Sequence, residues 1–236
     1  MDALIEMTKS KLTMNYKSFR LAVIAALFFK ASKTYKACNA LLKEGFAEDS
    51  EALTRILFEE MLKIGYCSIG ENECNQFLDS DIKQSIKALN AIISNPKEVP
   101  EEFFETIGNY SLEELKKEKV SLLTKPDANE ISIEAMVKRI DKENQDKNYT
   151  MIKLYNVYYR SVCNVVHTNP NAITSYLIFK DNKSIDLNPN FEANKCHPEM
   201  TSIEFMLMIL NFISKVFGFP TNEEIEHLNS IKTNSF

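Results

Sequence analysis

The sequence predicts an all-α protein, a multi-helix bundle built on antiparallel helix hairpins. Its 236 residues include only five Gly and seven Pro, while good helix formers such as Leu, Lys and Glu are abundant. Apolar residues recur at three- and four-residue spacing over long stretches, which is the helical period. Gly or Pro follows several of these stretches, as expected where helices end. A chain of this length, 44% hydrophobic, can bury a sizeable core.

The N-terminal part of the chain is expected to hold four helices. They cover residues 2–14, 16–44, 48–69 and 72–94. Apolar side chains surround the second helix over residues 21–29, which predicts central burial. Gly45 stands just past its end, and residues 48–50 supply N-cap side chains for the third helix. The short connection makes these two helices an antiparallel hairpin.

Residues 97–148 are the least regular part and are interpreted as a helical insertion over one side of the bundle. Three short helices are expected in it, starting near Pro100, Ser111 and Ser132. The polar run 141–148 would then be a linker. A protein partner is one candidate for what this insertion contacts.

The C-terminal part is expected to contain the β structure and the last long helix. Apolar and β-branched residues flank a polar turn and predict one small β-hairpin near 174–187. The apolar helix Met200–Phe217 precedes Gly218, and a terminal helix covers 221–231. We therefore expect one domain, residues 1–236, with core segments 16–95 and 149–218.

Charge and cysteine content limit the class of protein. The net charge of −5 argues against indiscriminate binding to nucleic acid, although the first 43 residues are basic and could steer a polyanion or form a solvated face. No signal peptide is predicted, and the apolar run 21–29 is about half the ~20 residues of a membrane span. Five cysteines without a CxxC pair fit reduced thiols and a cytoplasmic location. Cys196, His197 and Glu199 form only a weak metal-ligand pattern, so we expect no metal and no cofactor.

One amphipathic helix ending near His167 carries the most informative polar residues. Its apolar stripe consists of Leu154, Tyr158, Ser161, Val162 and Val165. The opposite face carries Arg160, Asn164 and His167, together with Lys153 and Asn156. A proline three residues further on opposes continuation of the helix. A fixed cation, an amide and a titratable imidazole thus share one face near a helix end. The alternative is an ordinary solvated surface.

A second informative pair is Arg55 and Glu59, one helical turn apart among large apolar residues. On a surface this order is the poorer one for an ion pair, so we expect the pair to be partly buried. The chain has 28 Lys and Arg, of which only Arg20, Arg55, Arg139 and Arg160 are Arg. Arg55 and Arg160 are therefore interpreted as positions that need a planar, multidentate cation. For Arg55 a structural ion pair is the alternative.

Arg160 and His167, with six residues between them on one helix, resemble the motif of the HEPN superfamily. These are helical-bundle proteins, and many are metal-independent ribonucleases. In their motif a His follows the Arg after four to six residues, often with a polar residue directly after the Arg, here Ser161.

Three segments are similar to a poorly characterised bacterial family of helical proteins. They are Ala52-Leu53-x-Arg55-x-x-x-Glu59 after Gly45, Tyr159-Arg160-x-x-Cys163-x-x-Val166-His167, and the last long helix ending in Phe217-Gly218. The likeness covers about residues 20–95 and 150–218. Cys163 departs from the pattern, which more often has Ser, and the gap of six is the longest that the motif allows.

The resemblance implies RNA cleavage by attack of a 2′-hydroxyl on the adjacent phosphate. Arg160 would hold the phosphate, His167 would transfer protons, and Asn164 would orient His167 or hydrogen-bond the phosphate. The supporting residues would be Arg55, Glu59, Tyr159, Ser161 and Cys163. A toxin or an antiviral-defence effector would be the biological setting.

The superfamily joins two such helices across a homodimer, and a homodimer is expected here as well. The Met200–Phe217 helix, apolar on more than one face, gives the same expectation. The rival hypothesis is a non-catalytic helical module, antitoxin-like or structural, that binds a nucleotide or a protein partner. In that case Arg160 and His167 only hold the bundle together.

Overall fold

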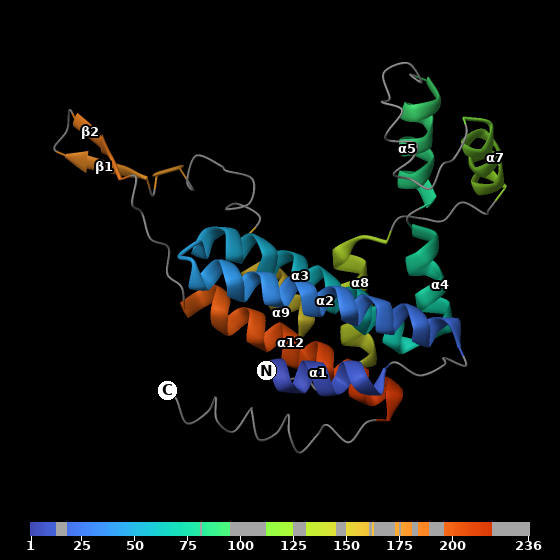
Figure 1. Ribbon diagram of the computed structural model, residues 1–236, viewed down its shortest axis with the longest axis horizontal. Helices are drawn as coiled ribbons and strands as arrows, with labels where there is room; N and C mark the ends of the chain where they lie inside the picture. Colours follow the sequence, from blue (N-terminus) through green and yellow to red (C-terminus); the bar gives the residue numbers. More distant parts are fainter. Residues whose placement is uncertain are drawn as a thin grey trace. The chain divides into compact units, whose positions relative to one another are not determined.

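The computed structural model describes residues 1–12, 18–80, 82–94, 112–124, 131–144, 150–160, 162, 173–174, 176–180, 184–188 and 196–218. Over these ranges the protein is a helical bundle with one small antiparallel β-hairpin, which confirms the predicted fold class (Figure 1).

Contacts along the chain group it into two compact units, residues 1–71 with 133–236 and residues 72–132. The first contains α1 (Asp2–Lys11), α2 (Phe19–Lys43), α3 (Ala47–Ile69), α8 (Ile133–Glu143), α9 (Met151–Leu154), the π-helical turn η1 (Tyr155–Tyr159), β1 (Leu177–Lys180), β2 (Ser184–Leu187) and α12 (Cys196–Phe217). The second contains α5 (Ile82–Ser94) and α7 (Leu112–Leu123), and α4 (Glu71–Ser80) begins at the boundary. The single-domain organisation, with an insertion at 97–148, stays a prediction.

The core of the first unit lies among α2, α3 and α12, which all pack against one another. α2 buries one stripe at three- and four-residue spacing, made of Ile24, Ala25, Phe28, Ala31, Ser32, Tyr35 and Cys38. α12 contributes the buried side chains Phe205, Met206, Leu207, Ile209, Leu210 and Ile213. Each fully buried Phe, Leu, Ile or Met contributes about 1.5–3 kcal/mol relative to exposure. This buried stripe fixes the rotation of α2 about its axis. The packing of α2 against α3 confirms the predicted helix hairpin.

A Schellman motif joins α2 to α3. Gly45 has φ +92°, and the backbone amides of Phe46 and Gly45 donate to the carbonyls of Leu41 and Leu42 at 2.8 and 3.3 Å. The predicted helix-ending role of Gly45 is confirmed, because a residue with a Cβ is strained at this φ. The predicted N-cap role of residues 48–50 is wrong. α3 begins at Ala47, so Ser50 lies inside the helix, and its buried hydroxyl donates to the Cys38 carbonyl at 3.1 Å.

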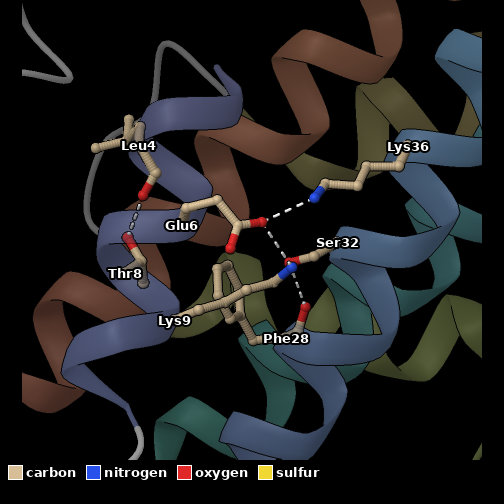
Figure 2. A network of polar contacts seen from close by, with 7 residues as sticks. All are labelled: Leu4, Glu6, Thr8, Lys9, Phe28, Ser32 and Lys36. Atoms are coloured by element: carbon tan, nitrogen blue, oxygen red, sulfur yellow. Dashed lines mark hydrogen bonds and ion pairs between the residues drawn. The ribbon is translucent and has the colours of Figure 1, made fainter.

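A carboxylate of α1, Glu6, is bonded to Lys36 of α2 (Figure 2), and Ile5 of α1 is fully buried. Glu6 accepts hydrogen bonds from Lys36 at 2.8 Å and from Lys9 at 3.1 Å. These two bonds lower the pKa of the exposed Glu6 carboxyl. Two buried hydroxyls turn back on their own helices, Thr8 to the Leu4 carbonyl and Ser32 to the Phe28 carbonyl, both at 2.8 Å. The hydroxyls are thereby satisfied without a partner across the helix–helix contact.

Several cations of the basic N-terminal segment have acidic partners inside the chain. They are Lys9 and Lys36 with Glu6, Lys30 with Glu60, and Arg20 with Glu71. These pairs reduce the charge that this segment presents to a polyanion, and they favour the solvated-face alternative for it.

The remaining differences from the predicted elements concern helix ends. The expected helix 72–94 corresponds to α4 and α5, and residue 81 between them lies outside the described residues. The expected helix 2–14 ends at Lys11. α7 and α8 correspond to the short helices predicted to start at Ser111 and Ser132. The helices predicted near Pro100 and at 221–231 lie outside the described residues.

α12 is long and apolar enough over His197–Phe217 to cross a membrane by length and composition alone. Its packing against both α2 and α3 is that of a core helix, and core helices pass the same test. This packing covers part of the apolar surface from which a homodimer was inferred, while Met208, Phe212 and Val216 are half-buried. The homodimer stays a prediction.

The hairpin pairs β1 with β2 in the register Leu177↔Leu187 to Lys180↔Ser184. It lies within the predicted range 174–187. One face of this small sheet carries Leu177, Phe179, Ile185 and Leu187, and the last three are exposed. The other face carries an ion pair between Lys180 and Asp186.

Candidate functional site

The helix with the predicted site residues begins at a cap supplied by α8. Asp141 accepts hydrogen bonds from the backbone amides of Met151 and Ile152, at 2.6 and 2.9 Å from its two carboxylate oxygens. These amides have no partner inside their own helix, so the carboxylate satisfies them. Asp141 was predicted to open a linker. It instead lies in α8 and fixes where α9 starts.

The chain then passes through a π-helical turn, η1, where the sequence predicts a regular α-helix. Such turns insert an extra residue and often occur at functional sites. Tyr158 and Val162 are nevertheless buried, while Lys153, Asn156 and Arg160 are exposed. For these residues the predicted apolar and polar faces are confirmed.

Three of the predicted supporting residues meet in one polar cluster between α3 and η1. The Tyr159 hydroxyl donates to Glu59 Oε1 at 3.0 Å and accepts a bond from Arg55 Nη2 at 3.3 Å. Arg55 Nη2 lies 3.5 Å from the same carboxylate oxygen, and the two side chains are 20% and 24% exposed. The Arg55–Glu59 pair is therefore partly buried, as the sequence predicts.

Burial raises the pKa of the Tyr159 phenol; the Arg55 hydrogen bond opposes this rise, and the Glu59 carboxylate adds to it. At neutral pH the phenol is consequently protonated and remains a donor to Glu59. Phe58 lies below it, with ring centroids 5.5 Å apart, and Phe58 also packs at 5.2 Å from Phe205 in the core. Tyr159 is thus held at its hydroxyl and along its ring.

A series of ring contacts connects this cluster to the surface. The Arg55 guanidinium carbon lies 5.1 Å from the Tyr159 ring centroid, and the Tyr155 and Tyr159 rings stack at 5.4 Å and 19°. The Arg160 guanidinium carbon lies 5.3 Å from the Tyr155 centroid. Arg160 is exposed and Tyr155 is partly exposed. Cation–π contacts at exposed positions contribute about 0.5–1 kcal/mol each.

Two further carboxylates of α3 bind residues from later segments. Glu48 accepts a hydrogen bond from the Tyr176 hydroxyl, and Glu51 Oε1 lies 3.2 Å from His197 Nδ1. The His197 ring stacks on Tyr158 at 5.8 Å. Burial raises the pKa of the Tyr158 phenol, and the charge of Glu51 adds to that rise.

One face of α3 therefore presents a row of charged residues, each contacting a segment more distant in sequence. The row consists of Glu48, Glu51, Arg55 and Glu59, spaced by three or four residues. The spacing is a signal that sequence reasoning missed for Glu48 and Glu51. No sequence signal identifies their partners Tyr176 and His197. The contact of Tyr155 with Tyr159 has such a signal in their four-residue spacing on one helix, which the prediction did not use.

The four other predicted site residues, Ser161, Cys163, Asn164 and His167, lie outside the described residues. Of the predicted catalytic set, the described part of the chain contains Arg160, at the outer end of the ring contacts. Among the residues that the structure describes, no three His, Cys, Asp or Glu side chains gather closely enough to hold a metal ion. His197, one residue of the weak metal-ligand pattern in the sequence, lies beside Glu51.

The protein belongs to a family of unknown function (DUF5677), whose model matches residues 21–185. The match includes most of α2, the whole of α3 and η1, and most of the hairpin. Comparisons with curated proteins and with solved structures find no match.

Proposed function

We propose that the protein is an HEPN-like, metal-independent endoribonuclease that acts as a toxin or antiviral-defence effector. The observation that supports this proposal is the placement of Arg160. It is exposed at the end of a π turn, next to a residue anchored to α3 by Arg55 and Glu59. An arginine presented to solvent from a fixed backbone can bind a phosphate in a defined orientation.

In the proposed reaction the 2′-oxygen of a ribose attacks the phosphorus of its own 3′-phosphate. The bond from phosphorus to the 5′-oxygen of the next nucleotide breaks, leaving a 2′,3′-cyclic phosphate and a 5′-hydroxyl. His167 transfers the proton of the attacking 2′-hydroxyl to the departing 5′-oxygen, since an unperturbed imidazole titrates near pH ~6.5. Arg160 stabilises the charge that builds on the phosphate oxygens, and Asn164 orients His167.

Local charge supports phosphate binding at this helix although the whole chain is acidic. Residues 150–160 contain Lys153 and Arg160 and no Asp or Glu. Both cations are exposed, and the charge of Arg160 also acts on Glu134 of α8, a carboxylate that is paired with Lys138. A short basic segment of this kind attracts a polyanion locally, while the net charge of −5 suppresses binding elsewhere.

The test is cleavage of a single-stranded RNA by purified protein in EDTA, with the product ends identified. Wild-type protein should yield cyclic phosphate ends, and His167→Ala should lower the rate about 10²–10⁴-fold. Arg160→Lys should also lose activity, because Lys keeps the charge and loses the planar fork. Arg139→Lys in α8 is the matched control and should retain activity. The proposal would be refuted if His167→Ala cleaved RNA at the wild-type rate, or if the wild-type protein cleaved RNA only in the presence of a divalent ion.

The second candidate function is a non-catalytic helical module that binds a nucleotide or a protein. The row on α3 favours it, because Glu48, Glu51 and Glu59 each contact a different later segment and so act as a structural seam. Under this hypothesis Arg160→Lys and His167→Ala change binding or stability, and wild-type protein leaves RNA intact.

A further inference from the structure

We infer that Tyr155 is a stacking platform for an unpaired base of single-stranded RNA, which brings a neighbouring phosphate to Arg160. This inference rests on the proposed function for the identity of the ligand. It deepens that function by naming the substrate class, a strand whose bases are accessible.

The Tyr155 platform rests on Tyr159, whose position is fixed by contacts with α3. The Tyr155 ring lies nearly parallel to the Tyr159 ring, at 5.4 Å and 19°. Tyr159 is itself held by two hydrogen bonds, to Glu59 and Arg55, and by the Phe58 ring. A ring that is already oriented loses little freedom when a base stacks on it, so more of the contact energy appears as affinity.

Binding of a nucleotide is expected to displace Arg160 from the Tyr155 ring. Its guanidinium lies against the Tyr155 ring at 5.3 Å, yet the side chain is exposed and can move. An exposed cation–π contact is equivalent to about 2–5-fold in a binding constant. A stacked base contributes about 5–150-fold. A base on Tyr155 therefore outweighs the contact it replaces, and it releases Arg160 to bind a phosphate oxygen.

Two features favour single-stranded RNA as the ligand: an aromatic ring that lies next to cations, and the net negative charge of the chain. Residues 150–160 interleave Tyr155 with Lys153 and Arg160 and contain no acid, which is the pattern of single-strand binding sites. Phosphate attraction alone is weak for a protein of net charge −5. In a duplex each base is covered by its neighbours, so a paired strand presents no face to Tyr155.

The experiment uses the full chain and a single-stranded hexaribonucleotide with one 2-aminopurine, 2′-O-methylated throughout so that it is not cleaved. Stacking should quench the 2-aminopurine fluorescence when wild-type protein binds. Tyr155→Phe should keep the quenching, and Tyr155→Leu should abolish it and weaken binding about 5–150-fold. Phe179→Leu, an exposed aromatic on the hairpin, is the matched control and should bind as wild type does. The same sequence as a duplex should not compete.

Three outcomes would overturn the inference. They are binding by wild-type protein without quenching, equal binding by Tyr155→Leu that keeps its helical circular dichroism, and preference for the duplex or for a DNA strand over the RNA. The first needs no variant, so it tests the inference even if Tyr155→Leu does not fold. Cleavage of unmodified RNA is measured in parallel. Tyr155-dependent quenching without cleavage refutes the nuclease alone, whereas cleavage that is unchanged in Tyr155→Leu refutes the platform alone.

Discussion

Replacement of Arg55 with Ala should destabilise the protein by about 2–4 kcal/mol. The change removes the hydrogen bond to the Tyr159 hydroxyl, the ion pair with Glu59 and the cation–π contact. A hydrogen bond to a charged group contributes about 1.5–3 kcal/mol, and the ring contact adds about 0.5–1 kcal/mol. The pair is about one-fifth exposed, so the cost lies below the ~3–5 kcal/mol of stranding a fully buried charge.

The assays are urea unfolding and thermal unfolding, both followed by circular dichroism, with Lys63→Ala on the same helix as control. A change of 1 kcal/mol shifts Tm by about 2–4 °C in a chain of this size, so Arg55→Ala should lower Tm by about 4–16 °C. Combining Arg55→Ala with Tyr159→Phe should give a coupling of about 0.5–3 kcal/mol, because the two side chains share one hydrogen bond. Equal, small effects of Arg55→Ala and Lys63→Ala would show that the cluster does not stabilise the fold.

Three further outcomes are expected. Lys30→Ala should cost more stability in urea than Lys33→Ala does, because Glu60 is 1% exposed and Lys30 lies 3.0 Å from it. The free energy of unfolding should fall between about pH 9 and 11, because burial raises the pKa of the Cys38 thiol from 9.0 to about 11 and the unfolded chain therefore loses its thiol proton first. In Cys38→Ala the free energy of unfolding, measured in urea, should depend less on pH over this range. Light scattering at micromolar concentration should give twice the chain mass of 27.1 kDa, and a monomer mass would contradict the homodimer.

Much of the fold follows from local rules that are readable in the chain. Helical period and the two glycines Gly45 and Gly218, both with positive φ, place the long helices to within a few residues. The order Arg55 before Glu59 indicated partial burial correctly, because an exposed pair of that order is poorly favoured. Ser50 was assigned wrongly because capping and a buried contact with another helix demand the same residue type.

The contacts that join α3 to later segments at the candidate site are not local, and therefore the sequence did not reveal them. Tyr159 and Arg55 are 104 positions apart, and Tyr176 and Glu48 are 128 apart. Only the packing of α3 against later segments decides which hydroxyl reaches which carboxylate. The π turn could not be predicted from the sequence either, because a single inserted residue does not produce a repeating pattern of apolar side chains.

The orientation of Arg160 is a consequence of two anchors on consecutive residues. Tyr158 packs against Phe58 and Phe205 in the core, with ring centroids 6.3 and 5.1 Å away, and Tyr159 is bonded to α3. Because two consecutive side chains leave a helix in different directions, fixing both of them fixes the rotation of the helix about its axis. The next residue, Arg160, must then face solvent, as observed. The partly buried pair of Arg55 and Glu59 therefore sets the direction of Arg160 without touching it, and this gives a pair on α3 a role in a site on the surface.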